Sequence, residues 1–248
     1  MTDSPASASE GARAPLVDAA TPVASTPWSR LAPAMCARPG LLIVLGVALA
    51  AAGRPLLWMN VLIIPVDVVT LLLVHRLLRA EGRGLADLLR PVRGGDLARG
   101  LLCGLIVVLA WFPASFIAGL VAYRGPMPTA AYQSVPLWIA LVGVTIMPVT
   151  IGLAEEALYR GYLQPRLAGV LGQARAVIAA SAFFAVQHIA FAPFDPRAMV
   201  FGIVRTFLAG LVFAGLLMWR KRVIPLAIGH WLLDLLGLGL PVLLWSLQ

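Results

Sequence analysis

The sequence predicts an all-α protein, a polytopic bundle of about seven transmembrane helices. The first reason is composition, because 60% of the 248 residues are hydrophobic and only 12% are charged, whereas a soluble domain is about half apolar and a quarter charged. The second is that apolar residues gather in segments on the order of 20 residues, which suits a hydrocarbon core about 30 Å thick. The third is that basic residues fall between those segments, as expected of loops at a membrane surface.

The predicted spans follow one another along most of the chain. In order they cover residues 40–52, 56–78, 97–123, 135 to beyond 156, 174–191, 198–219 and 223–245. The first is too short to cross alone, so we expect it to extend through Pro55 toward the second. Each later segment is apolar over enough residues to cross a bilayer as a helix.

Three stretches complete the predicted organisation. Residues 1–33 are rich in Ala, Ser, Pro and Thr and lack an apolar run long enough to bury, so they predict a disordered N-terminal tail. Residues 34–248 then form the transmembrane domain. Residues 84–95 are too short and too charged to span, and we expect a short amphipathic helix at the membrane surface there.

Basic residues between the spans predict the orientation of the chain. They concentrate after the second, fourth and sixth spans, at Arg76, Arg79, Arg83, Arg90, Arg93 and Arg99, at Arg160, Arg166 and Arg175, and at Arg220, Lys221 and Arg222. Because basic loops stay in the cytoplasm, we expect the N-terminus inside and the C-terminus outside. Anionic lipids account for the formal net charge of +8, so no nucleic-acid partner is expected. The abundance of Ala, Arg, Gly and Leu is typical of a GC-rich bacterial genome and indicates the bacterial inner membrane.

Ionisable residues within the predicted spans gather in the second half of the chain. They are Glu155, Glu156 and Arg160 in the fourth span, His188 in the fifth, and His230 and Asp234 in the seventh. Each costs roughly 3 kcal/mol near the bilayer centre, so such groups usually face a cavity. We therefore expect them to meet in the core of the bundle.

Helical spacing gives these residues a geometry. Glu156 and Arg160 are four apart and can pair on one face. That pairing leaves Glu155 free, because it projects about 100° further round the helix. His230 and Asp234 also share a face, so the carboxylate can accept a ring N–H and fix the tautomer of the histidine. A free glutamate beside two histidines could act as a general base on a water molecule.

Three motifs carry a family resemblance. EExxxR at residues 155–160, FxxxH at 184–188 and HxxxD at 230–234 occur in this order on successive predicted helices. Each is common alone, but the ordered set resembles the CPBP family of intramembrane proteases, which includes CAAX prenyl endopeptidases, Abi-type proteins and bacteriocin-processing enzymes. The resemblance covers about residues 137–244, which would be the motif-bearing core.

The resemblance implies a role for each motif residue. Glu155 would activate the water, and His188 would work with it. Glu156 and Arg160 would hold their helix in place, and His230 would help to stabilise the oxyanion. The implied activity is hydrolysis of a peptide bond in a membrane-associated protein or peptide.

Asp234 departs from the family pattern, which more often has asparagine at this place. An amide can donate a hydrogen bond to an oxyanion, whereas an ionised carboxylate repels one. Asp234 must therefore be protonated or must orient His230 instead, and we favour orientation.

Metal dependence is left open by the sequence. The family has been described both as metalloproteases and as glutamate-dependent hydrolases. Glu155, His188 and His230 could bind zinc, since two nitrogens and a carboxylate form a known ligand set. No HExxH motif is present, so we favour a metal-free mechanism that needs no cofactor.

Two further charged residues lie in the predicted spans outside the motifs. We expect Asp67 to pair with a buried arginine or to line the cavity. Arg205 begins the sixth span, and we expect its side chain to extend to the membrane surface.

Two rival functions use the same buried residues. A proton-coupled transporter would use them as a relay, although no internal repeat relates the halves of the chain. A catalytically inactive scaffold would keep these residues to stabilise the bundle. The departure of Asp234 from the family pattern supports this alternative. The predicted spans also place Glu155 and His188 at different depths, so either the fourth helix continues past Arg160 or the fifth begins later.

Overall fold

The computed structural model describes residues 21–23, 26–54, 56–126, 128 and 135–248. These residues form helices and no strand. The helices, in chain order, are α1 (Trp28–Ala51), η1 (Leu56–Trp58), α2 (Met59–Arg79), α3 (Leu85–Leu89), α4 (Asp96–Tyr123), α5 (Leu137–Thr145), α6 (Met147–Glu155), η2 (Glu156–Leu163), α7 (Gln164–Leu171), α8 (Gln173–Val186), η3 (Gln187–Phe191), α9 (Pro196–Arg220), α10 (Val223–Asp234), η4 (Leu235–Gly239) and α11 (Leu240–Ser246).

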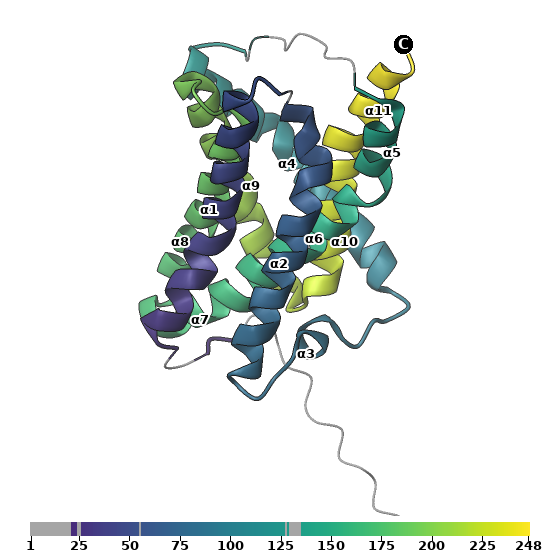
Figure 1. The fold of residues 1–248 in the computed structure, drawn as a ribbon. Coiled ribbons are helices and arrows are strands. Elements are labelled where there is room, and N and C mark those ends of the chain that lie inside the picture. The colour runs from purple at the N-terminus through teal and green to yellow at the C-terminus, as the bar shows by residue number, and fades with distance from the viewer. Residues whose placement is uncertain (1–20, 24–25, 55, 127, 129–134) are drawn as a thin grey trace, which may run out of the picture.

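The predicted fold class is confirmed by this arrangement. Within the described ranges, 6 helices are long and apolar enough to cross a membrane, and a bent pair raises the number to 7. The bent pair joins α5 to the continuous run from α6 to α7 at an angle of 41°. Pro148 lies in the first turn of α6, where a missing N–H is tolerated. The helices form the upright bundle seen in Figure 1.

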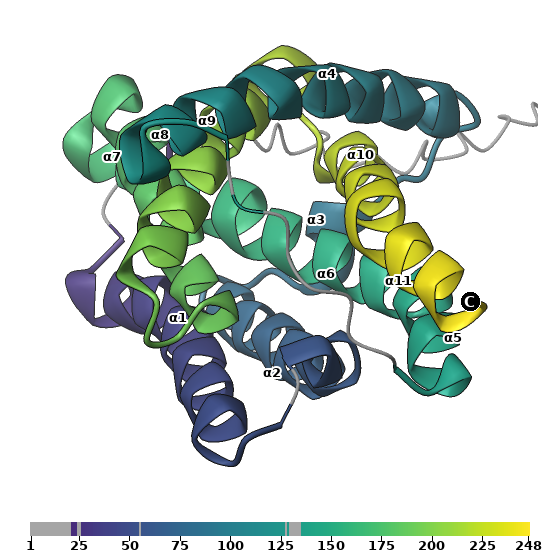
Figure 2. The ribbon, with the colours of Figure 1, turned by 90° about the horizontal axis from the view of Figure 1, so that it is seen from above.

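The run from α6 to α7 is the central element of the bundle. Figure 2 shows α6 surrounded by α1, α2, α4, α9 and α10. Every residue from 154 to 168 is buried. A helix enclosed by other helices can carry charged groups that lipid would not tolerate, which explains how this span holds the acidic motif.

The first helix differs from its prediction. It begins at Trp28 rather than near residue 40, and it contains Pro33 and Pro39. Residues 28–33 of the predicted tail are therefore helical, and residues 1–20 and 24–25 of that tail lie outside the described residues. The helix includes Arg38, which is buried with its charge paired inside the bundle.

The predicted surface helix at residues 84–95 is shorter than expected. Only α3 is helical there, and Asp87 caps it by accepting a 2.7 Å hydrogen bond from the Gly84 backbone. The remainder continues as a connection that Arg222 holds by donating hydrogen bonds to Asp96 and to the Pro91 carbonyl. This end of the bundle is thus tied together by charge.

Close helix contacts at two glycines place the central elements. A Cβ at Gly152 of α6 would lie 2.7 Å from the Ala227 oxygen of α10. A Cβ at Gly46 of α1 would lie 2.1 Å from the Ala190 oxygen of η3. Since these are backbone atoms of neighbouring helices, any side chain at either position would push two elements apart.

Candidate active site

Glu155 ends α6 in the middle of the bundle and is only 3% exposed. Its Oε1 accepts a hydrogen bond of 2.8 Å from Arg38 and one of 2.9 Å from the Gln187 side chain. Its Oε2 lies 3.5 Å from Nε2 of His230. The prediction that Glu155 is left free was wrong, because a residue of the first helix pairs with it.

Arg38 joins three helices through its guanidinium group. Besides Glu155, it contacts Asp67 of α2 at 2.5 Å and the Gln187 Oε1 of η3 at 3.1 Å. Tyr159 also donates to Gln187 Oε1, at 2.9 Å. The expectation that Asp67 pairs with a buried arginine is confirmed. Sequence reasoning missed Arg38 and Gln187, although Gln187 directly precedes the motif histidine.

Glu156 and Arg160 form the predicted pair, with 3.0 Å between Oε1 and Nη1. The same oxygen lies 2.8 Å from Nδ1 of His230, so Glu156 also holds the histidine of α10. The Arg160 guanidinium lies over the rings of Phe184 and Phe213, at 4.4 Å and 4.9 Å from their centroids. Glu156 therefore connects the fourth and seventh spans, beyond its pairing within the helix.

His188 has one ring nitrogen in use and one available. Its Nδ1 lies 3.0 Å from the Phe184 carbonyl oxygen. A carbonyl can only accept, so Nδ1 carries the hydrogen and Nε2 of the neutral ring is an acceptor. The structure also resolves the difference in depth, because the fourth helix continues past Arg160 to Leu171.

Four motif residues line one cavity of about 280 Å³. They are Glu155, His188, His230 and Asp234, contributed by α6, η3 and α10. Apolar residues form most of the remaining wall. Two histidines and two carboxylates therefore meet in an enclosed, largely apolar space, which is the arrangement expected of a reactive centre.

Asp234 does not orient His230 as expected. Its Oδ2 lies 3.7 Å from Nε2 of His230, too far for a hydrogen bond. Glu156 binds the other ring nitrogen instead. Oδ2 of Asp234 is buried and has no hydrogen-bond partner among the described residues. Asp234 thus brings an unpartnered polar atom to the wall of the cavity.

The described part of the chain forms two π-helices at the site, of which η2 contains Glu156 and Arg160. One is η2, which follows Glu155 and begins with Glu156, and the other is η4, which follows Asp234. Wide turns of this kind are rare and occur frequently at functional sites. Nothing in the hydrophobic pattern predicted them.

Arg205 lies elsewhere than predicted. It lines the same cavity, and its guanidinium lies 4.4 Å from the Trp111 ring centroid and 4.8 Å from that of Phe201. Its expected extension to the membrane surface is therefore wrong. The aromatic side chains of α4 and α9 hold it beside the motif residues.

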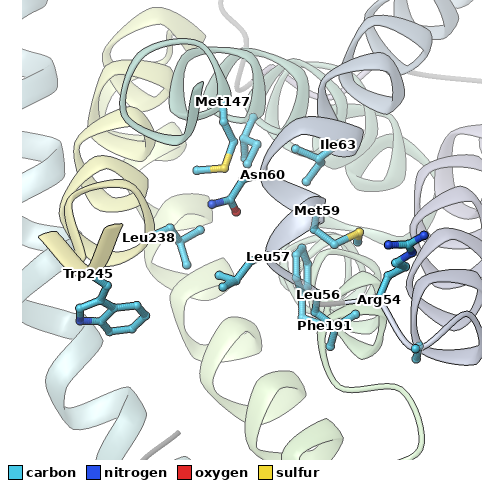
Figure 3. Close-up of a pocket in the computed structure, with 13 residues that line it drawn as sticks. Arg54, Leu56, Leu57, Met59, Asn60, Ile63, Met147, Phe191, Leu238 and Trp245 are labelled. Atoms are coloured by element: carbon cyan, nitrogen blue, oxygen red, sulfur yellow. The ribbon is translucent and has the colours of Figure 1, made fainter. Parts of the chain in front are cut away.

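A second cavity of about 560 Å³ adjoins the first. The two share Ile63, Ile151, Phe191 and Leu238 as wall residues. Figure 3 shows Leu57, Met147 and Leu238 around this space, with Arg54 at its edge. The amide nitrogen of Asn60, also in the wall, is buried without a hydrogen-bond partner in the described part of the chain. A mainly apolar compartment thus leads to the polar one.

Glu155, His188 and His230, which the sequence suggested as zinc ligands, are not arranged as a metal site. Among the residues that the structure describes, no group of three or more His, Cys, Asp or Glu side chains could hold a metal ion. Glu155 is instead bound by the Arg38 cation, which would repel a divalent ion at the same carboxylate. The steps proposed below therefore use no metal.

The comparison with protein families gives one match. Residues 134–236 match the family model described as type II CAAX prenyl endopeptidase Rce1-like. The match includes the six motif residues and Arg205 but excludes Arg38 and Asp67. No curated protein and no solved structure matched the chain.

Proposed function

We propose that the chain is an intramembrane endopeptidase that hydrolyses a peptide bond of a membrane-associated protein or peptide, because residues 134–236 match the Rce1-like type II CAAX prenyl endopeptidase model. The supporting observation is that Glu155, His188 and His230 line one cavity between the spans. Hydrolysis needs a base for water and a donor for the oxyanion, and these side chains supply both kinds of group.

Glu155 is the general base of the proposed reaction. Arg38 and Gln187 occupy its Oε1, so Oε2 is the atom available to a water molecule. As the water oxygen bonds to the scissile carbonyl carbon, Oε2 takes one of its protons. When the C–N bond breaks, that proton passes to the leaving amine. Nε2 of His188 would accept a second hydrogen bond from the water and so fix its direction of attack.

His230 stabilises the oxyanion of the tetrahedral intermediate. Its Nδ1 is bound to Glu156, so Nε2 can donate only from the doubly protonated ring. The carboxylates of Glu155 and Glu156 lie 3.5 Å and 2.8 Å from the ring nitrogens and would offset that positive charge. Arg160 acts behind the site as a positioning residue, because it holds Glu156.

Asp234 participates as a protonated acid. Its Oδ2 is buried and unpartnered among the described residues, so a proton there would be free to point toward an oxyanion in the cavity. In this form it substitutes for the amide that the family more often has. An ionised Asp234 would oppose the reaction by repelling the oxyanion.

The substrate reaches the site from the adjoining apolar cavity. That compartment of about 560 Å³ shares a wall with the catalytic cavity, and its size falls in the range of ligand sites, roughly 300–1,000 Å³. A membrane-associated peptide with an apolar segment or an attached lipid chain, such as the prenyl group named in the family description, suits such a wall.

The proposed location is the bacterial inner membrane with the N-terminus in the cytoplasm. Figure 1 shows α3, α7 and the start of α1 at one end of the bundle and the C-terminus at the other. The arginine-rich connections lie at the first of these ends, and basic loops stay inside. Accessibility of single introduced cysteines to a membrane-impermeant thiol reagent, in cells with Cys36 and Cys103 replaced, tests this orientation.

The first experiment compares protein termini in membranes of cells that express wild type or Glu155→Gln at equal levels. New termini that appear only with wild type support proteolysis and identify the substrate and the cleaved bond. Asp87→Asn, which changes an exposed carboxylate on α3 to an amide, serves as the matched control. Identical termini from folded, inserted proteins would favour the inactive scaffold, or the transporter if liposomes containing the protein move a solute.

A further inference from the structure

Arg205 is a cation in the catalytic cavity to which the reaction assigns no role. It lies nine residues into α9, about 14 Å from the start of that helix, and lines the same cavity as Glu155, His188 and His230. Its Nε is buried without an acceptor, and no described residue accepts a hydrogen bond from it or forms an ion pair with it. A guanidinium group has five N–H donors, so its hydrogen-bonding capacity is unused.

The fully buried arginines of the described bundle each hold a carboxylate, whereas Arg205 is half-buried. Arg38 contacts both Asp67 and Glu155, Arg160 contacts Glu156, and Arg166 contacts Glu81. A buried charge normally needs such a partner. Arg205 lines the candidate catalytic cavity, and no described carboxylate pairs with it. The missing anion is therefore expected to arrive with the substrate.

The rings beside Arg205 hold it without using its donors. Trp111 and Phe201 lie 4.4 Å and 4.8 Å from the guanidinium carbon. Aromatic faces attract a cation through their quadrupole, whereas the N–H groups of guanidinium lie in its own plane. The group is thus oriented with its donors open to a planar, two-oxygen acceptor.

We propose that Arg205 binds a carboxylate of the substrate and so selects which peptide bond reaches Glu155. This inference rests on the proposed proteolysis and deepens it. Peptides carry carboxylates at the C-terminus and on Asp and Glu side chains, and a carboxylate matches the guanidinium fork in a bidentate manner. Because the cavity has only about 280 Å³, a carboxylate bound there fixes the cleaved bond within a few residues of it.

A binding experiment tests the carboxylate separately from catalysis. The full chain with Glu155→Gln, with or without Arg205→Gln, is reconstituted in nanodiscs with a fluorescent, farnesylated peptide that ends in a CAAX sequence. The peptide is used with a free C-terminus, with a C-terminal amide, and as an amide with Asp in the last position. We expect the free acid to bind about tenfold or more tightly than the plain amide, since charge-assisted hydrogen bonds are strong, and Arg205→Gln to reduce this ratio to about one.

The third peptide and two variants separate the sources of the effect. If the Asp-containing amide binds as tightly as the free acid, Arg205 recognises any nearby carboxylate of the peptide. If it binds as weakly as the plain amide, Arg205 recognises the C-terminal carboxylate alone. Arg205→Lys, which keeps the charge without the fork, should retain part of the preference. Arg197→Gln, an exposed arginine at the start of the same helix, should retain all of it. A merely structural role of Arg205 would weaken all three peptides equally.

Cleavage of the same peptides by chains with Glu155 intact distinguishes the two proposals. If wild type cleaves them and Arg205→Gln keeps the ratio of acid to amide cleavage, the carboxylate role is overturned while proteolysis stands. If wild type cleaves none of the three peptides, they are not substrates, and the binding experiment alone tests the role of Arg205. In that case, a preference for the acid that is lost in Arg205→Gln supports the role of Arg205, whereas equal binding or no binding overturns it.

Discussion

Arg38 of the first helix donates a hydrogen bond of 2.8 Å to Glu155, a residue 117 positions further along the chain. The same guanidinium binds Asp67 at 2.5 Å. The proposed general base is therefore held by an element outside the segment that matches the family. The first helix thus contributes to the candidate site by holding Glu155, although none of its described residues lines the cavity.

Arg38→Gln is expected to lower both stability and activity. The variant leaves Asp67 and Glu155 as buried carboxylates without their cation, and breaking a buried pair in this way costs about 3–5 kcal/mol. Thermal unfolding in detergent and peptide cleavage measure the two effects, and we expect cleavage to fall by at least about tenfold. Arg79→Gln, an exposed position at the end of α2, should change the unfolding free energy by no more than about 0.5 kcal/mol.

The double variant Arg38→Gln with Asp67→Asn separates stability from catalysis. Removing the second buried charge should recover part of the lost stability, while Glu155 still lacks its cation and activity stays low. A double-mutant cycle quantifies this coupling. Recovery of activity together with stability would mean that Arg38 acts only on the fold.

Glu155→Gln is expected to lower cleavage by about 10²–10⁴-fold without unfolding the protein. The amide oxygen can still accept from Arg38, but it cannot take a proton from water. Initial rates on a farnesylated CAAX peptide, together with the melting temperature, measure this change. Cleavage at more than about a tenth of the wild-type rate would contradict the role of Glu155 as the base.

Asp234→Asn is expected to preserve or increase activity. The amide supplies a permanent donor to the oxyanion where the acid supplies one only when protonated, and one such donor contributes about 10²–10³-fold to kcat. Asp234→Leu, similar in size but without a donor, should lose activity. Steady-state kinetics of the pair decide the matter, and a large loss in Asp234→Asn would show that the negative charge itself is required.

Gly152→Ala is expected to reduce activity through helix spacing. The added Cβ would lie 2.7 Å from the Ala227 oxygen, so α6 and α10 must separate and His230 must move relative to Glu156. Gly215→Ala on α9 is the control, because a Cβ there meets nothing within 4 Å and alanine favours a helix by up to about 1 kcal/mol. Cleavage and melting temperature should fall for the first variant and hold or rise for the second.

Metal chelators are expected to leave cleavage unchanged. In the arrangement observed, the Arg38 cation binds Oε1 of Glu155 and would repel a divalent ion at the same carboxylate. Assays with EDTA and with 1,10-phenanthroline, followed by addition of zinc, test this point. Inhibition by both chelators that zinc reverses would assign the site to a metal.

The sequence was sufficient for the parts of the fold that depend on local pattern. Apolar runs gave spans close to α2, α4, α8, α9 and the run from α10 to α11. The Glu156–Arg160 pair followed from helical spacing alone, and the structure contains it. Both results depend on residues near each other in the chain.

The errors arose where distant residues decide the outcome. Sequence reasoning missed Arg38, because its partners Asp67 and Glu155 lie 29 and 117 residues further along the chain. Arg205 was predicted to reach the surface from its place at the start of the sixth span. The prediction failed because Trp111, one of the rings that contact Arg205, belongs to a different helix. His230 lies 2.8 Å from Glu156 but 3.7 Å from Asp234, so it is Glu156 that binds the ring. Sequence spacing along one helix cannot give these distances.

The salt bridge between the first two helices has a consequence for biogenesis. The chain is synthesised from its N-terminus, so Arg38 enters the membrane long before Glu155 exists. Asp67 is only 29 residues behind it, and a hairpin of α1 and α2 can therefore insert with the two charges already neutralised. An unpaired arginine in the bilayer interior costs roughly 3 kcal/mol on insertion scales. We therefore expect that replacing Asp67 slows membrane integration of the first helix, before Glu155 has been synthesised.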